Sequence, residues 1–379
     1  MIEARSLTKR FGSRLAVDAL SFDVRPGRSV RSPGSGSTSS PAGKEHEHNE
    51  GPGEPAVRQG PGVGDAGGGT AVTGIKLKAG RKTIELSNAE KVLFPDDGIA
   101  KRDLAGYYGG VAGLMLPLLR DRPVSMTRFP DGIAAHGIVQ KNVPAYFPDW
   151  ITRARVRKEG GSLQQVVIDK PATLVYLAGQ ACIELHAFLS RLDRIREPDQ
   201  LIFDLDPPDD HHFDDVRVCA LRLRELLSDE LRLPSFVKTT GGKGLHVHVP
   251  LRPAKDFDAV REFARQVADL LAARNPGLLT TEQRKDKRGP RIYADIMRNA
   301  YAQLAVAPYA VRARPGAPVA APLSWDEVAD EHLSPGQFTL RTMPGRIRDS
   351  RPEAGPWAGM ARRRTGLDRA RTLIRRLAA

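Results

Sequence analysis

The chain has 379 residues, and 58 Lys and Arg against 45 Asp and Glu give it a formal net charge of +13 at pH 7. This length allows two domains with cores of their own, and the basic excess favours nucleic acid over an anionic membrane surface as partner. No run of about 18 apolar residues is present to span a bilayer, and no apolar signal segment follows Met1. We therefore expect a cytoplasmic, nucleoid-associated protein without a membrane partner. The two cysteines, Cys182 and Cys219, argue against a disulfide framework and a Cys-based zinc site.

The first 80 residues divide into two stretches of different composition. Residues 1–28 predict two short strands and resemble the start of an ABC-transporter ATPase, but the phosphate loop G-x-x-x-x-G-K-[ST] that should follow is absent. We interpret 1–28 as an orphaned fragment. Residues 29–80 are dominated by Gly, Ser, Pro and Ala and predict a disordered linker, in which His46 and His48 are solvated.

From Thr83 onward the pattern is that of a globular protein. Ser87, with Glu90 at the capping-box position, predicts the start of a short helix. Helical spacing predicts helices over 101–119, 173–188, 213–227 and 256–273. Strands are predicted over 124–128, 166–168, 202–205, 234–240, 245–249 and 291–296. Alternating strands and long helices favour an α/β or α+β fold.

The stretch 201–207 carries two carboxylates in an apolar run. Residues two apart in a strand point to the same face, so Asp204 and Asp206 would project side by side. Adjacent carboxylates repel each other unless a positive charge lies between them, and hard divalent cations prefer oxygen ligands. The pattern predicts a metal site. A strand end running into a solvated turn is the alternative.

The stretch 238–248 combines glycines, a hydroxyl, a lysine and two histidines. Glycines such as Gly244 let the backbone approach a ligand, while Thr240 offers a hydroxyl and Lys243 a point charge, which suits a triphosphate. His246 and His248 share one face of the strand that follows. A plain hairpin turn with an exposed His face is the alternative.

A third stretch, 284–295, joins clustered basic residues to a strand that contains Asp295. A carboxylate flanked by apolar residues needs a metal or a cation to stay charged, so a salt bridge to Arg298 or Arg312 is the alternative to a metal. Carboxylates on separate strands, a His and clustered cations together suit two-metal nucleotidyl transfer. The same groups also suit a metal-dependent phosphohydrolase built from Asp204, Asp206 and the two histidines.

Collinear motifs over two thirds of the chain resemble the polymerase domain of bacterial DNA ligase D, in the archaeo-eukaryotic primase superfamily. They are, in order, Leu86-Ser87-Asn88, Lys91-Val92-Leu93-Phe94-Pro95, Gly98-Ile99, Lys101, Arg122-Pro123-Val124, Arg128-Phe129-Pro130-Asp131-Gly132, Gln140-Lys141, Phe203-Asp204-Leu205-Asp206-Pro207, Gly244-Leu245-His246, Asp295, Ala307-Pro308-Tyr309 and Val311-Arg312-Ala313-Arg314-Pro315. The resemblance implies a primase-like core of mixed sheet with packed helices and a smaller N-terminal α/β subdomain. We expect this domain at 81–345 and an Arg-rich tail or helix at 346–379.

The resemblance also implies roles for single residues. Asp204, Asp206 and Asp295 would be catalytic and bind two Mn²⁺ or Mg²⁺ ions, strongly only when a nucleoside triphosphate is bound. The nucleotide-binding residues would be His186, Thr240, Lys243, Gly244, His246, Lys285, Arg288 and Arg312. Lys91 and Lys101 fall where the family binds the 5′-phosphate at a DNA break, a task that suits closely spaced point charges.

The implied activity is addition of nucleotides, preferentially ribonucleotides, to DNA ends and short gaps in non-homologous end joining. DNA ends and gapped DNA with a 5′-phosphate would be the ligands, and Ku and a separate ATP-dependent DNA ligase the partners. A catalytically weak module that binds DNA ends and 5′-phosphates is the alternative function.

Four positions depart from the family pattern. Thr240 replaces a Ser. Ile138 and Val139 replace a pair of Phe residues, which predicts a weaker stacking platform for template bases. Tyr301 is expected to narrow the nucleotide pocket.

Overall fold

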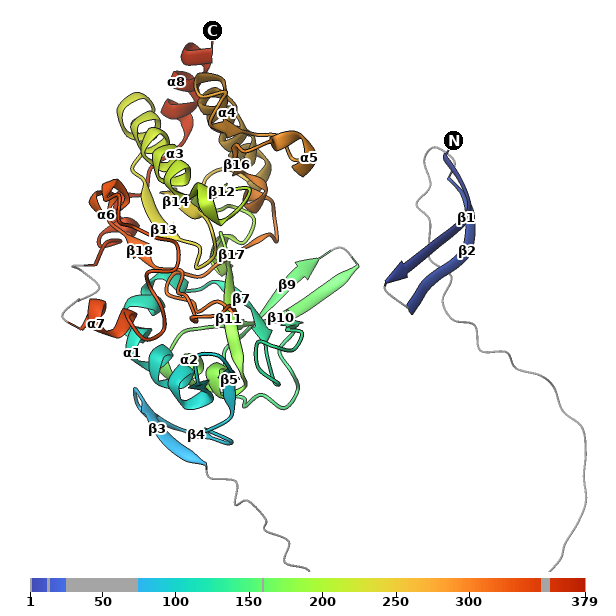
Figure 1. The fold of residues 1–379 in the computed structure, drawn as a ribbon, viewed down its shortest axis with the longest axis vertical. Coiled ribbons are helices and arrows are strands. Elements are labelled where there is room, and N and C mark those ends of the chain that lie inside the picture. Colours follow the sequence, from blue (N-terminus) through green and yellow to red (C-terminus); the bar gives the residue numbers. More distant parts are fainter. Residues whose placement is uncertain (1, 12–13, 25–73, 159, 349–354, 379) are drawn as a thin grey trace, which may run out of the picture. The chain divides into compact units, whose positions relative to one another are not determined.

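The computed structural model of the chain describes residues 2–11, 14–24, 74–158, 160–348 and 355–378 (Figure 1). The chain divides into two compact units, 1–68 and 69–379. In the first unit, strands β1 (Ile2–Phe11) and β2 (Arg14–Val24) pair as an antiparallel hairpin, which confirms the two predicted strands and lengthens both. The predicted linker up to residue 73, with His46 and His48, lies outside the described residues.

The second unit begins with two small hairpins. Strand β3 (Ile75–Ala79) pairs with β4 (Lys82–Leu86), and β5 (Val92–Phe94) pairs with β6 (Ile99–Ala100). The linker prediction is therefore wrong for 75–79, because alternate side chains of β3 pack against the core. The helix predicted from Ser87 is also wrong. Residues 87–90 form a turn, in which Asn88 takes the left-handed backbone conformation that interrupts a helix.

The first large sheet lies beside two helices, α1 (Lys101–Leu119) and α2 (Pro171–Gly179), which pack against each other. Its strands pair antiparallel, and β8 (Ile138–Gln140) adds to β7. Their order is β17 (Leu304–Val306), β11 (Cys182–Phe188), β7 (Pro123–Arg128), β10 (Gly161–Val167) and β9 (Arg153–Lys158). The helix predicted at 101–119 is confirmed.

The helix predicted over 173–188 is wrong in its second half. Helix α2 ends at Gly179, Ala181 adopts a left-handed conformation, and the chain continues as β11. Ile183, Leu185 and Ala187 are buried on one face of β11, whereas Glu184 and His186 point to its other face and are only partly buried. His186 therefore lies on a strand.

The second large sheet contains the strand with the two carboxylates. Its order is β15 (Leu279–Thr280), β16 (Ile292–Asp295), β12 (Gln200–Asp206), β14 (Leu245–Pro250), β13 (Phe236–Thr239) and β18 (Pro322–Leu323). All pairs are antiparallel except β15 with β16. Residues 201–205 of β12 are buried. The fold is mixed α/β, as predicted.

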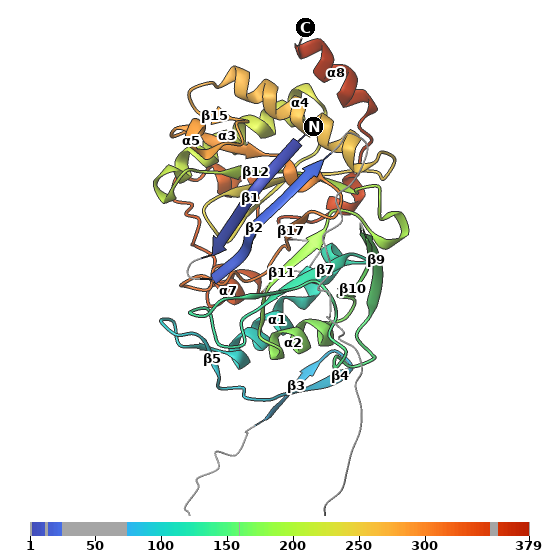
Figure 2. The same cartoon turned by 90° about the vertical axis from the view of Figure 1, so that its right-hand side faces the viewer.

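Helices cover the second sheet (Figure 2). Helix α3 (Phe213–Glu225), which runs into a π turn at Leu226–Glu230, and α4 (Phe257–Arg274) both pack against β12. Helix α8 (Asp368–Ala378) packs against α4. Short helices complete the unit: α5 (Lys285–Arg288), α6 (Trp325–Ala329) and α7 (Met343–Ile347). No helix in the described ranges is long and apolar enough to cross a membrane.

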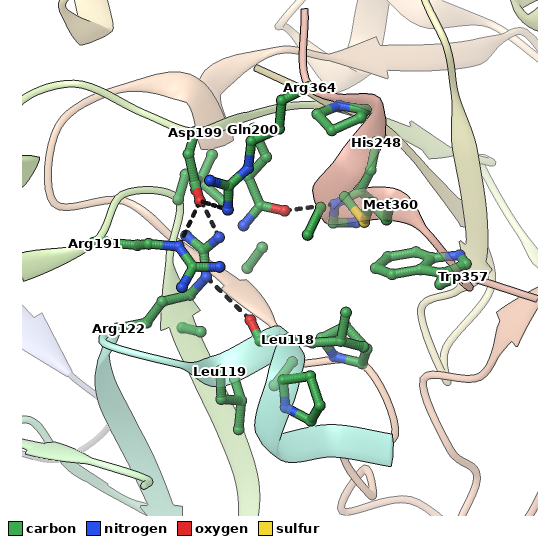
Figure 3. A pocket seen from close by; sticks show the side chains of 18 of the residues that line it. Leu118, Leu119, Arg122, Arg191, Asp199, Gln200, His248, Trp357, Met360 and Arg364 are labelled. Atoms are coloured by element: carbon green, nitrogen blue, oxygen red, sulfur yellow. Dashed lines mark hydrogen bonds and ion pairs between the residues drawn. The ribbon is translucent and has the colours of Figure 1, made fainter. Parts of the chain in front are cut away.

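One buried carboxylate ties the two sheets together. Asp199, the residue before β12, is 2% exposed and binds three arginines beside a cavity of about 50 Å³ (Figure 3). Its Oδ1 lies 2.6 Å from Arg122 at the start of β7. Its Oδ2 lies 2.8 Å from Arg191 and 3.0 Å from Arg364 of the C-terminal segment. Burial alone would raise the pKa of Asp199, but the charge of Arg122 and the hydrogen bonds from Arg191 and Arg122 outweigh it and lower the pKa.

Replacing Asp199 with Asn should lower the free energy of unfolding at pH 7 by about 3–5 kcal/mol, because the arginines would stay buried without their counter-charge. Urea unfolding measures this loss. The control is Asp193→Asn at an exposed position nearby, which should change stability by less than about 0.5 kcal/mol.

The Asp199→Asn variant also tests how the stabilisation by Asp199 depends on pH. The folded-state pKa of Asp199 is lowered, so its stabilisation is complete above the unfolded pKa of about 4 and is lost as the pH falls through the folded value. The stability difference between the wild type and Asp199→Asn should therefore shrink on acidification below about pH 4. Equal stabilities at pH 7 would contradict the role of Asp199.

Candidate active site

Strands β12 and β16 place the three predicted carboxylates on one face of the second sheet. Asp204 lies opposite Asp295 in the antiparallel register, and Asp206 lies two residues further along β12, on the same face. Residues directly opposite have Cβ atoms about 4.5–5.5 Å apart. Within the part of the chain that the structure describes, no three Asp, Glu, His or Cys side chains are grouped closely enough to hold a metal ion. The carboxylates are thus neighbours that do not converge on one point.

Asp204 is part of a row of ionisable side chains that crosses four strands. His246 on β14 lies opposite Asp204, and Lys238 on β13 lies opposite His246. With Asp295 on β16, the row reads Asp295, Asp204, His246, Lys238. The last three are 8%, 3% and 0% exposed. Burying such groups is costly unless they neutralise each other, which makes the row a candidate functional site.

Two neighbours keep Asp204 ionised. His246 Nε2 lies 3.3 Å from its Oδ1, and Arg298 Nε lies 3.4 Å from its Oδ2. Burial alone would raise the pKa of Asp204, but His246 and then Arg298 outweigh it and lower the pKa to about 2. Burial, followed by the charge of Lys238, lowers the pKa of His246 to about 4. At neutral pH we therefore assign an uncharged His246 that donates its Nε2–H to Asp204.

Lys238 has no role in the sequence-based prediction, yet its side chain is fully buried. Burial lowers its pKa to about 7, while the charge of Asp204 acts in the opposite direction. Its Nζ donates to the carbonyl of Thr239 at 3.3 Å. Its position directly after Phe236 and Val237 in a predicted strand was the available signal, because a buried Lys requires a partner.

The remaining two carboxylates are compensated less completely, because nearby cations do not outweigh the effects that raise their pKa. Burial raises the pKa of both Asp206 and Asp295, and the negative charge of Asp204 raises both further. Asp295 Oδ1 accepts a hydrogen bond from the backbone of Met297 at 2.7 Å. A divalent cation would relieve this repulsion, and carboxylate oxygens suit Mg²⁺ and Mn²⁺. The donor set therefore fits such an ion.

A pocket of about 360 Å³ opens beside these carboxylates, between the two large sheets. Its wall includes strands of both: His186 on β11, Leu304 and Val306 on β17, and Asp204 on β12. It is lined by His186, Asp204, Asp206, Pro207, Pro208, Thr240, Gly242, Lys243, His246, Lys285, Arg298, Leu304, Val306, Arg312 and Arg314. Eight predicted site residues thus meet in one pocket. Arg298, considered only as a salt-bridge partner, and Arg314 were not predicted to belong to the site.

The loop 240–244 contributes Thr240, Gly242 and Lys243 to the lining of this pocket. The Thr240 hydroxyl accepts hydrogen bonds from the backbone of Gly242 at 3.1 Å and of Gly244 at 3.3 Å, and lies 3.1 Å from the Gly244 carbonyl. It therefore shapes the loop. Gly241 has a φ of +63°. A Cβ at Gly244 would lie 2.1 Å from the carbonyl oxygen of Leu205 on β12, so this position requires glycine.

Glu184 connects two of the predicted nucleotide-binding residues. Its Oε2 lies 3.3 Å from His186 Nε2, and its Oε1 accepts from Arg312 Nε at 2.8 Å. Arg312 in turn donates to the carbonyl of Thr240 at 2.8 Å. Burial would raise the pKa of Glu184, but hydrogen bonds from His186 and the charge of Arg312 lower it to about 2. Sequence analysis missed Glu184, whose role depends on contacts with residues 128 positions away.

Five predicted site residues do not line the pocket: Asp295, Gly244, Arg288, Lys91 and Lys101. Arg288 donates to the carbonyls of Glu282 and Gln283 at 2.9 and 2.8 Å, and its guanidinium lies 3.7 Å from the centre of the Tyr293 ring. Its charge still acts on Asp206 and Asp295, where it lowers the pKa.

Lys91, just before β5, and Lys101, the first residue of α1, form a separate basic site outside this pocket. Lys101 is 7% exposed and donates to the carbonyl of Ser87 at 2.9 Å, and Lys91 lies 3.1 Å from Asp131. Burial lowers the pKa of Lys101, and the charges of Lys91 and Arg128 lower it further. Mutual repulsion among these cations would be relieved by an anion.

The structure places two of the departures from the family pattern, the pair Ile138 and Val139 and the residue Tyr301, in different surroundings. Ile138 and Val139 on β8 are 52% and 62% exposed, so they present a small apolar surface. Tyr301 does not line the pocket, which corrects the expectation that it narrows it. Its ring packs edge-on against Phe188 and Phe257 instead, and its hydroxyl donates to the carbonyl of Arg157.

Comparison with known proteins agrees with this geometry. A family model described as "LigD, primase-polymerase domain" matches residues 100–354. A protein of Mycobacterium tuberculosis named "Multifunctional non-homologous end joining DNA repair protein LigD" is 32% identical over 265 residues, covering 67% of this chain and 34% of that protein. The "Bifunctional non-homologous end joining protein LigD" of Bacillus subtilis is 31% identical over 266 residues, covering 70% and 42%.

The fold is similar to that of a solved structure. The "Polymerase Domain from Mycobacterium tuberculosis Ligase D in complex with DNA" has 31% sequence identity and a TM-score of 0.66, covering 70% of this chain and 95% of that one. This chain thus spans about a third of the length of the full-length M. tuberculosis relative.

Adding one methyl group at Gly244 should disturb the junction of β12 and β14. We expect Gly244→Ala to lower the free energy of unfolding by about 1–3 kcal/mol, because its Cβ would overlap the Leu205 carbonyl. Gly242→Ala in the same loop is the matched control, since its Cβ would meet nothing closer than 3.3 Å. Denaturant unfolding of both variants makes the comparison, and equal losses would show that the overlap is unimportant.

Proposed function

The chain belongs to the family of LigD primase-polymerase domains and is therefore a polymerase-type nucleotidyltransferase, and we propose that it adds nucleotides, preferentially ribonucleotides, to DNA ends and short gaps in non-homologous end joining. The observation that carries this proposal is the carboxylate face formed by Asp204, Asp206 and Asp295 beside a pocket rich in cations. Ku and a separate ATP-dependent DNA ligase are the proposed partners.

Asp204, Asp206 and Asp295 would hold two Mn²⁺ or Mg²⁺ ions, with triphosphate oxygens completing the ligand set. Such ions, when bound, lower the barrier to attack by a 3′-hydroxyl on the α-phosphate and stabilise the leaving pyrophosphate. Arg298 and His246 hold Asp204 ionised and oriented. This arrangement makes the carboxylate available as a ligand at neutral pH.

The remaining pocket residues suit a nucleoside triphosphate. Lys243, Lys285, Arg312 and Arg314 line the same pocket as Asp204 and Asp206, and their positive charge would neutralise the phosphates. The Thr240 hydroxyl fixes the loop whose backbone would approach them. His186 and the apolar Leu304 and Val306 would contact the sugar and base.

Lys91 and Lys101 would bind the 5′-phosphate on the far side of a gap. Their separation from the catalytic pocket suits this task, because a gap separates the growing 3′-end from the downstream 5′-end. Lys101 is held in place by the Ser87 carbonyl, and its repulsion with Lys91 would be relieved by the phosphate.

Asp204→Ala should abolish nucleotide incorporation, with a loss of about a thousandfold, since metal ions contribute several kcal/mol to such a reaction. Primer extension on gapped, 5′-phosphorylated DNA with manganese measures it. Asp209→Ala, at an exposed acid a few residues away, should retain the wild-type rate.

Two outcomes would favour other functions. DNA binding without incorporation by the wild type would indicate the end-binding module, which the separate Lys91 and Lys101 site would serve. Strand cleavage without a nucleoside triphosphate would indicate a phosphohydrolase.

Restoring an aromatic pair on β8 should strengthen template binding. Ile138→Phe with Val139→Phe should tighten primer-template affinity, because base stacking on an aromatic ring contributes about 1–3 kcal/mol per base. Both positions are exposed, so the folded state accepts the rings. The control pair is Ile138→Leu with Val139→Leu. Fluorescence anisotropy with labelled primer-template gives the affinities, and equal values for both pairs would refute a stacking platform on β8.

A further inference from the structure

The chain leaves the second sheet directly after Asp295. Asp204 pairs with Asp295, so continuing the antiparallel register would place Met297 opposite Ile202, two residues back along β12. The chain instead turns through a 3₁₀ segment at Met297–Asn299. Strand β16 therefore supplies no backbone partner to Ile202.

The side chain of Asn299 takes the place of that missing partner. Its Oδ1 accepts the backbone N–H of Ile202 at 2.8 Å, and its Nδ2 donates to the carbonyl of the same residue at 2.7 Å. A primary amide offers the same acceptor and donor as a peptide group. Nδ2 also donates to the carbonyl of Ile296 at 2.9 Å, and the residue is 1% exposed. Asn299 thus extends the hydrogen bonding of β12 where β16 ends.

These three bonds lie next to two of the carboxylates. Ile202 is two residues before Asp204, and Ile296 directly follows Asp295. The same turn supplies Met297, whose N–H bonds Asp295, and Arg298, whose Nε lies 3.4 Å from Asp204. Any shift of Asn299 would therefore move both carboxylate-bearing strands and the arginine that contacts Asp204.

We propose that Asn299 is a positioning residue, which sets the spacing and orientation of Asp204 and Asp295 and holds Arg298 against Asp204. The proposal rests on the proposed function, because it assigns a role in placing metal ligands. The alternative is that Asn299 only provides hydrogen-bond partners for buried backbone groups. In that case its replacement would lower stability and leave metal binding unchanged. Replacing a group that orients a metal ligand without touching the metal typically changes metal affinity by about 10–100-fold.

The test uses Asn299→Asp, which keeps the shape and the Oδ1 acceptor but replaces the donor of two hydrogen bonds with an oxygen facing two carbonyls. We expect the affinity for Mn²⁺, measured by electron paramagnetic resonance with a non-hydrolysable ribonucleoside triphosphate, to fall at least about tenfold. In primer extension, the Mn²⁺ concentration for half-maximal rate should rise to the same extent. The KM for nucleotide at saturating Mn²⁺ should stay unchanged, because the side-chain hydrogen bonds of Asn299 go to Ile202 and Ile296 and none goes to Lys243, Lys285, Arg312 or Arg314.

Two further variants separate positioning from stability. Ile292→Val removes one methylene from the buried part of β16 and leaves the Asn299 amide in place, so it should lower the melting temperature without changing Mn²⁺ affinity. Asn299→Ser buries no charge and replaces Asn299→Asp if that variant does not fold. It should weaken Mn²⁺ binding in the same direction.

Failure of the positioning role and failure of the proposed function give different outcomes. Wild-type Mn²⁺ affinity in a folded Asn299→Asp or Asn299→Ser variant, with a lowered melting temperature alone, would overturn the positioning role. An equal loss of affinity in Ile292→Val would overturn it too. A wild-type protein that neither binds Mn²⁺ with a triphosphate nor extends a primer would overturn the proposed function itself.

Discussion

Asp204 is an ionised carboxylate buried in the central strand of a sheet, and stabilising its charge determines much of the surrounding structure. Three side chains stabilise it: His246 from β14 and Arg298 from the turn after β16 contact Asp204 directly. Lys238 from β13 interacts with it through its charge. Each needs the correct strand register, since a shift by one residue would send its side chain to the other face. The charge of Asp204 is therefore balanced only when the strands pair in the correct register.

The pocket exists because two sheets meet beside that strand. The first sheet contributes β11 and β17, and the second contributes β12 and the loop 240–244. Asp199 and its arginines join the sheets directly before β12, and Glu184 joins β11 to Arg312 and so to Thr240. Both connections are charge-assisted and largely shielded from water, which makes them strong and directional. Ion pairs at two places thus hold the two sheets together.

Strong local periodicity explains which parts of the fold were predictable. The helix at 101–119 and the strand around Asp204 have clear patterns, and the carboxylates on β12 and β16 were recognised in sequence. The helix predicted through His186 failed because an apolar run fits either period, and the left-handed Ala181 ends the helix. Glu184, Lys238 and Arg314 gave little sequence signal, because their contacts depend on register between distant strands. Tyr301 was misplaced for the same reason.

The hairpin of β3 and β4 affects how a shortened form of this protein would behave. From composition alone, a cut just before Thr83 looks harmless, yet β4 pairs with β3 along its length. Without β3, the backbone N–H and C=O groups of β4 would form an open edge, and such edges pair readily with other chains. A fragment cut there would keep its pocket and tend to self-associate, so the starting residue decides its solution behaviour.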